Sequence, residues 1–337
     1  MVVNPITHPG ANNGGSNKQE LFYKLWAGEV LTAFHRENKL LGLTRSKTIS
    51  SGKSAAFPIT GVATTAYHTA GESVYGTDNS QTSTYLSNIR GKEIEIFVDD
   101  PVVSGVFVPE IDRLMNYFDE RSVYTAEVGA ALAEQMDSNI LSTLQAAAYK
   151  DPADVNPTGV TNMATADKRA TIASETGANI ATRIFDIAQL FDEHSIPKMG
   201  RTVVLKPSAY HKLASVQDLV NKDFTSGPGD TTKREIMSVA GFNVVMSNAF
   251  RSGDDDEVAA PGVRNDPWGS VGIGYNADFT KQLGVCFVPD AMATVRLKEI
   301  GVDAEHSVER RGDLILSDYI AGHGTLRPDC AALIQLA

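Results

Sequence analysis

The sequence predicts an α+β fold with an elongated outline, because different stretches of the chain carry different hydrophobic patterns. Apolar residues recur at helical spacing over residues 110–148, a segment with no proline and one glycine. Residues 51–99 are rich in threonine, serine, tyrosine and glycine, and end in a strand-like alternation of charged and apolar residues. Strand and helix patterns alternate from residue 202 to residue 245, and the chain then finishes as a series of strands.

The composition is that of a folded, soluble chain. Of 337 residues, 42% are hydrophobic and 21% charged, and no apolar run approaches the roughly 20 residues of a membrane helix. The 41 acidic and 30 basic residues give a net charge of −11. A protein that binds a nucleic-acid backbone over a broad surface would need a positive charge. The chain has two cysteines, Cys286 and Cys330, which is too few for a disulfide framework. Its N-terminal residues lack the basic and apolar regions of a signal peptide.

The N-terminal segment predicts a flexible arm followed by a short helix. Residues 1–18 have no periodic apolar face and cannot offset the entropy of ordering. Residues 20–34 show helical spacing, broken at Gly28. This helix carries several aromatic side chains, which belong either to the protein's own core or to a docking surface for a neighbour: Phe22, Tyr23, Trp26 and Phe34.

Residues 51–99 predict a long two-stranded projection. Residues 92–99 alternate charged and apolar side chains, which is the period of a half-exposed strand. Turn residues gather between positions 70 and 80. The segment has few large aliphatic residues, and an isolated hairpin is marginal in water. We therefore expect it to rest on a neighbouring subunit and not on its own chain.

The segment 110–148 predicts one continuous helix of roughly 58 Å at ~1.5 Å per residue. Pro109 and the acidic residues Glu110 and Asp112 suit a helix start. A compact sphere of this chain length would be roughly 50 Å across. The helix would exceed that diameter, so we expect a flat or elongated molecule.

The second half predicts a compact α/β block and returning strands. The block follows a helix at 179–193 and contains a strand at 202–207, a helix at 208–220 and a strand at 241–245. Residues 251–270 predict a solvated loop with an acidic run at 254–257. The remaining strands are expected to be short, at residues 285–289, 293–300, 313–320 and 332–336.

No catalytic or metal-binding constellation is complete in the sequence. Ser51–Ser54 resembles the end of a phosphate-binding loop, but Lys47 stands where that motif needs glycine. Residues 71–75 fail the nucleophile-elbow pattern at Tyr75, and the seven histidines are scattered. The acidic run at 254–257 lacks the glycine and terminal glutamate of a calcium loop. We therefore expect a protein that is not an enzyme and uses no cofactor and no metal.

Several long strings closely resemble the major capsid proteins of the T-seven-like short-tailed bacteriophages, the autographiviruses. They occur in the family's order and span the chain from about residue 20 to its end. The strings are GEVLTAF (28–34), TISSGKSAAFP (48–58), IDRLMNYFDERSVYTAEVG (111–129), VAGFNVV (239–245) and GHGTLRPDCAALI (322–334).

The resemblance implies the Hong Kong 97 capsid fold and a division of the chain into four parts. These are an N-terminal arm (1–50), an extended loop (51–99), a peripheral domain with a long spine helix (100–195 and 285–322), and an axial α/β domain (196–284 and 323–337). The final strand is expected to rejoin the axial domain. No added C-terminal domain and no covalent lysine–asparagine crosslink are expected.

The resemblance also implies a function: self-assembly into hexamers and pentamers of an icosahedral head that encloses double-stranded DNA. The expected partners are further copies of the chain, a scaffolding protein and a portal, with DNA at the inner surface, no sequence-specific DNA binding and no membrane. The expected location is the virion, after assembly in the bacterial cytoplasm. Two other classes stay open: a soluble α/β enzyme with an unrecognised active site, and a secreted adhesin or receptor-binding module.

Charged residues at the base of the projection and at the start of the long helix are candidates for ion pairs across a subunit boundary. Such pairs set register and partner choice more than they add affinity. The candidate interface residues are Arg90, Lys92, Glu93, Glu95, Glu110, Asp112, Arg113 and Arg121.

Overall fold

The computed structural model describes most of residues 29–74, residue 89, residues 91–109, residue 111, and residues 121–156, 163–216, 238–250 and 281–337. The expected flexible arm, the aromatic residues Phe22, Tyr23 and Trp26, and the loop at 251–270 lie outside the described residues.

One layer of the fold is a four-stranded sheet that joins distant parts of the sequence. Its strand order is β1 (Arg45–Thr48), β10 (Met292–Ser307), β11 (Gly312–Thr325) and β4 (Val102–Pro109). β1 runs parallel to β10, and the other two pairings are antiparallel. Half-buried and exposed residues alternate along most of β4, so one face of this strand is covered, and β4 and β11 both pack on α3 (Arg121–Tyr149).

The second sheet has six strands and carries two helices. Its strand order is β5 (Arg169–Ile172), β12 (Ala331–Leu336), β9 (Gln282–Phe287), β6 (Thr202–Leu205), β8 (Phe242–Met246) and β7 (Ser238–Val239). β6 and β9 are buried along their whole length, as continuous apolar runs in a covered sheet predict. α5 (Gly177–Glu193) packs with α6 (Pro207–Ala214), β5 and β12. β12, from residues 331–336, therefore lies between β5 and β9 in this sheet.

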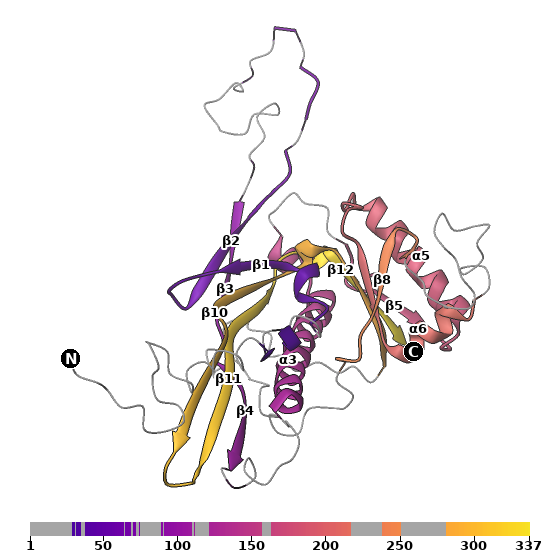
Figure 1. The fold of residues 1–337 in the computed structure, drawn as a ribbon. Helices are drawn as coiled ribbons and strands as arrows, with labels where there is room; N and C mark the ends of the chain where they lie inside the picture. Colours follow the sequence, from indigo (N-terminus) through magenta and orange to yellow (C-terminus); the bar gives the residue numbers. More distant parts are fainter. Residues whose placement is uncertain are drawn as a thin grey trace.

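The helix α3 lies between the two sheets and contacts strands of both (Figure 1). From Leu132 to Ala148 nearly every residue is buried, including polar residues such as Asn139 and Thr143. The hydroxyl of Thr143 donates to the carbonyl of Asn139 one turn earlier, at 2.9 Å, so this buried polar group is satisfied within the helix. α3 is thus a central helix, covered on several sides.

The predicted helix at 110–148 is described only in part. α3 (Arg121–Tyr149) contains 29 residues, about 43 Å at ~1.5 Å per residue, and Ile111 is also helical. Of the preceding predicted turns, residues 110 and 112–120 lie outside the described residues. A helix of this length fits inside a sphere of about 50 Å, so α3 alone does not require an elongated molecule.

The elongated outline comes instead from β10 and β11, which were expected to be short strands. They contain 16 and 14 residues, and β10 is about 54 Å long at ~3.4 Å per residue. The pairing of β10 with β11 has two register shifts, between Arg296 and Lys298 and between Lys298 and Gly301. They interrupt the alternation of apolar and polar residues by which a strand is predicted from sequence. At this irregularity the ammonium of Lys298 donates to Asp318 of β11 at 2.6 Å, which raises the pKa of Lys298.

α5 packs on the six-stranded sheet and not on the four-stranded one. Residues 169–193 were assigned to the peripheral part, but β5 pairs with β12 and α5 packs on the six-stranded sheet. Thr176 caps α5 by accepting from the amide of Asn179, and Ile180, Ile184 and Ile187 occupy its buried face. α5 therefore lies with the elements of the six-stranded sheet. α6 also ends earlier than expected, at Ala214, and residues 217–220 lie outside the described part.

A buried lysine closes the C-terminal end of α3. Lys168 is fully buried, and its ammonium donates to the carbonyls of Ala147, Lys150 and Pro328 at 3.2, 2.6 and 3.4 Å. A cation here satisfies carbonyls that the helix leaves free and complements the helix dipole. Burial lowers the pKa of Lys168 to about 8, against the opposing effect of Asp329.

A buried carboxylate ties the N-terminal segment to the middle of α3. Asp137 is 3% exposed and accepts from the backbone amides of Lys39 and Leu40 at 3.1 and 3.2 Å. Phe34, just before this contact, is buried beside Tyr319 with ring centroids 6.2 Å apart. Of the two alternatives for the aromatic residues of the N-terminal helix, Phe34 therefore belongs to the protein's own core.

Asp137 gives a pH-dependent contribution to stability. Burial raises its pKa from 3.8 to about 6, because the two amide hydrogen bonds do not compensate for lost hydration. The folded state then holds the proton more tightly than the unfolded state, so this contribution to stability is present below about pH 4 and is lost as the pH rises through about 6.

The variant Asp137→Asn lacks this pH-dependent contribution, because an asparagine side chain does not titrate. We expect the unfolding free energy of the native chain, minus that of Asp137→Asn, to fall by about 3 kcal/mol between about pH 4 and pH 7. Urea titrations check this, and a pH-independent difference would contradict it.

Candidate subunit-interface surfaces

The projecting loop begins as the predicted two-stranded ribbon. β2 (Ser54–Thr60) pairs antiparallel with β3 (Gly91–Phe97), and the described residues that follow β2, within 61–74, extend away from the body of the molecule (Figure 1). At its base, Ala55 and Ile96 form a buried cluster with residues of β10 and with Leu326. The expectation that the projection rests on a neighbour and not on its own chain is thus wrong for the base.

Two glycines in β11 allow this close contact. A Cβ atom built on Gly322 would lie 1.9 Å from the carbonyl oxygen of Phe97, and one on Gly324 would lie 2.7 Å from Ile96. Any larger residue at Gly322 must displace β3. The ribbon base is therefore fixed to the body by backbone-to-backbone contact.

Gly322→Ala should lift β3 away from β11, because the new methyl group has no space. We expect a loss of about 1–3 kcal/mol in unfolding free energy and faster amide exchange in β3. Gly42→Ala is the matched control, since nothing lies within 4 Å of a Cβ atom there. Thermal unfolding and hydrogen-exchange mass spectrometry measure both effects. Equal behaviour of the two variants would show that β3 is not held by this contact.

The candidate interface residues fall into two groups. Lys92, Glu93 and Glu95 are exposed on β3, and two of them already have contacts within the chain. The ammonium of Lys92 donates to the carbonyl of Asp154, and Glu95 accepts from the hydroxyl of Ser54. The others lie outside the described residues, or, for Arg121, have a side chain outside them: Arg90, Glu110, Asp112, Arg113 and Arg121.

Beyond its base, the loop presents large apolar side chains to solvent. Tyr67 is fully exposed, and Val62, Val74 and Ile89 are each more than two-fifths exposed. A protein that remains a monomer gains nothing from such exposure. These apolar side chains were not among the predicted interface residues, which are all charged, although they are the large apolar residues of a segment poor in aliphatic residues.

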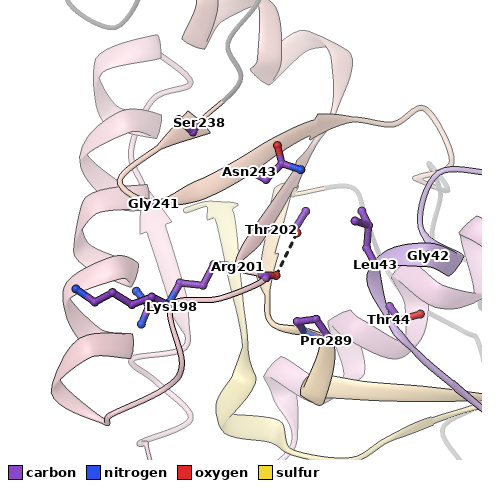
Figure 2. Close-up of a pocket in the computed structure, with 11 residues that line it drawn as sticks. Gly42, Leu43, Thr44, Lys198, Arg201, Thr202, Ser238, Gly241, Asn243 and Pro289 are labelled. Carbon is purple, nitrogen blue, oxygen red and sulfur yellow. Dashed lines mark hydrogen bonds between the residues drawn. The ribbon is translucent and has the colours of Figure 1, made fainter. Parts of the chain in front are cut away.

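A cavity of about 440 Å³ separates the N-terminal segment from the six-stranded sheet (Figure 2). Thr44, Thr202, Ser238, Asn243 and Pro289 are among its lining residues. Its lining is mixed, and no cluster of titratable groups converges on it.

The two cations at this cavity are occupied by one carboxylate. Lys198 extends away from Leu43 and Thr44, and its ammonium lies 3.1 Å from Asp192. Arg201 is paired with the other oxygen of Asp192 at 2.8 Å. The hydrogen bonds from Lys198 and Arg201 lower the pKa of Asp192. Among the described residues that line the cavity, both cations are therefore paired with Asp192.

The remaining reactive groups do not form a catalytic or metal centre in the described ranges. Both cysteines are buried and unpaired, and burial raises the pKa of Cys330 to about 12, far from thiolate chemistry at neutral pH. Across the described segments, no three histidine, cysteine or acidic side chains converge to hold a metal ion. Nor is any helix in those segments both long and apolar enough to cross a membrane.

Comparison with known proteins agrees with this architecture. Residues 56–335 match the family model described as Gp10A-like major capsid protein. The chain is 27% identical to the major capsid protein of Enterobacteria phage T3 over 339 residues, covering 98% of this chain and 95% of that one. It is 26% identical to the major capsid protein of Escherichia phage T7, covering 96% of each.

Solved capsid structures share the fold. The capsid structure of cyanophage P-SCSP1u is 31% identical, with a TM-score of 0.71 and 99% of both chains covered. The mature capsid of bacteriophage PhiM1 has a TM-score of 0.67 at 16% identity, covering 100% of this chain and 92% of that one. The α+β fold is thus the Hong Kong 97-like fold of phage capsids. With a family model that covers most of its length, the chain belongs to the Gp10A-like major capsid proteins.

Proposed function

We propose that this protein is the major subunit of a bacteriophage head, assembling into hexamers and pentamers that enclose double-stranded DNA. The observation that carries the proposal is the family match over residues 56–335, joined to a full-length likeness to capsid structures. Self-assembly into a shell is the activity of this fold in its phage relatives, and an enzymatic role has no support in them.

The exposed surfaces suit a subunit that has many neighbours. Beyond its base the loop exposes Tyr67, Val62 and Ile89, while the loop base is fixed to the body. We infer that the tip lies on an adjacent subunit. Many weak contacts of this kind hold each subunit in a closed shell, because all must break together before it leaves. The candidate ion pairs from Arg90, Lys92, Glu93 and Glu95 to Glu110, Asp112, Arg113 and Arg121 of a neighbour remain part of this proposal.

The proposed domain division follows the two sheets. The arm (1–50) and loop (51–99) are kept, although β1 of the arm pairs with β10. Residues 169–195 and 285–287 move from the peripheral to the axial domain, because β5, α5 and β9 pack in the six-stranded sheet and its helices. A scaffolding protein and a portal are proposed partners during assembly in the host cytoplasm. The net charge of −11 suits an inner surface that contacts packaged DNA without binding it tightly.

Negative-stain microscopy of the purified protein tests the proposed function. A capsid subunit gives closed shells, tubes or ring-shaped capsomers. Small discrete particles at every protein concentration, with or without a scaffolding partner, would contradict the proposal and favour the alternative of a soluble α/β enzyme.

Assembly should need neither a metal ion nor a nucleotide. We expect shells to form unchanged in EDTA and in nucleotide-free buffer, because assembly here depends on surface burial and strand contacts. Particle yield by sedimentation, with and without chelator, is the measurement. Loss of shells that one specific ion restores would indicate a metal site, with the acidic run at 254–257 as the first place to mutate.

A further inference from the structure

The two edges of the four-stranded sheet differ in chemistry. The edge strand β1 is exposed throughout and carries Arg45 and Lys47, and charged residues of this kind keep an edge strand from pairing with another chain. The opposite edge strand, β4, has the sequence VVSGVFVP and no charged residue over eight positions. Within the described part of the chain, β4 pairs on one side only, with β11. β4 thus has the features of an edge that accepts a further strand.

The two faces of β4 have different surroundings. Val102 and Val106 lie opposite the buried residues Tyr319 and Ile315 of β11, on the face that packs against α3. On the other face, Val103 is 50% exposed and Phe107 is 36% exposed. On β11 the partner of Phe107 is Leu314, which is also exposed, whereas the partner of Val103 is Asp318, which is paired with Lys298. The open edge therefore borders an uncovered apolar strip at its Phe107 end.

The spacing of β4 makes it complementary to itself. If two copies of β4 pair antiparallel about Gly105, Val103 of each lies directly opposite Phe107 of the other. Gly105 then faces Gly105, and aromatic–β-branched pairs flank it on the exposed face. Such cross-strand pairs stabilise a sheet, and no like charges meet anywhere along this strand.

We propose that β4 is a self-pairing edge, through which two copies of this chain join their four-stranded sheets across a two-fold axis at Gly105. The inference rests on the proposed function, since it names one contact of the proposed shell. An isologous contact needs one self-complementary patch, and β4 supplies it. The two sheets become one continuous eight-stranded sheet with α3 of each copy on the same side.

Engineered disulfides test the register of this contact. In the double variant Val103→Cys/Phe107→Cys, each new thiol lies directly opposite its partner in the other copy, where Cα atoms are about 4.5–5.5 Å apart. Mild oxidation of assembled shells should therefore give a covalent dimer on a non-reducing gel. Val103→Cys alone and Phe107→Cys alone are matched controls that should give none, because identical residues are then four positions apart along the strand. The native Cys286 and Cys330 are buried and do not interfere.

A charge exchange provides a second measurement. Val103→Glu/Phe107→Glu places like charges opposite each other twice and should abolish shells while leaving a folded subunit by circular dichroism, because both sites are exposed. Val103→Glu/Phe107→Lys places opposite charges in register and should restore them. Normal shells from the double glutamate variant, or uncrosslinked shells from the double cysteine variant, would overturn the pairing and leave the proposed function standing. An unmodified chain that forms no shells would overturn both.

Discussion

Leu132→Pro is expected to unfold the subunit and abolish assembly. Leu132 lies in the interior of α3 and is 1% exposed between the two sheets. Proline removes one helical hydrogen bond and clashes with the preceding turn, which costs ~3 kcal/mol or more, and the lost leucine side chain adds a core defect. Because α3 contacts both sheets, a kink there disturbs both. Circular dichroism and sedimentation of the purified variant are the measurements.

The matched control is Leu132→Met, which keeps the side-chain volume and should cost less than about 1.5 kcal/mol. Shells should form normally from it. If Leu132→Pro also gave normal shells, the continuity of α3 would not be needed for the fold or for assembly, and this prediction would be wrong.

Deletion of residues 66–82 is expected to leave a folded subunit that cannot close shells. The deletion removes the loop tip with the exposed Tyr67 but spares β2 and β3, which pack on the chain's own β10. Helix content and thermal unfolding should therefore match those of the intact chain, while closed particles disappear. Tyr67→Ser is a milder companion variant and should lower the yield of particles without affecting the fold.

The result to look for is a separation of folding from assembly. Unfolding of the deletion variant together with α3 would show that the tip belongs to the subunit's own core. Normal closed shells would show that the tip makes no contact needed between subunits.

Much of the fold follows from local patterns in the sequence. β6 is a continuous apolar run, and α5 has a clear amphipathic period, so both were predicted close to their observed bounds. β10 was predicted at half its length because its register shifts break the alternation near Gly301. Lys168 was not predicted at all. Lysine is rarely fully buried, so the sequence gives no reason to expect it in the core. Only the tertiary fold brings the three carbonyl groups to the ammonium of Lys168.

The candidate interface was harder to predict than the fold. Charged residues such as Lys92 and Glu95 attract attention in a sequence, but here they have intrachain contacts with Asp154 and Ser54. The role of Gly322 depends on how closely β3 approaches β11, and nothing in the local sequence reports that distance. The contrast between a charged β1 edge and an uncharged β4 edge appears only when the strand order is known.

The order of strands also determines when the subunit can fold during synthesis. β11 lies inside the four-stranded sheet and β12 lies inside the six-stranded sheet, and both come from residues 312–336. During synthesis, β4 has no partner strand until β11 is made, and β5 has none until β12 is made. Such long-range pairing folds slowly and leaves apolar strands open in the meantime. A nascent chain that stops before residue 312 therefore has neither sheet complete, and its apolar strands lack their partners until residues 312–336 are made.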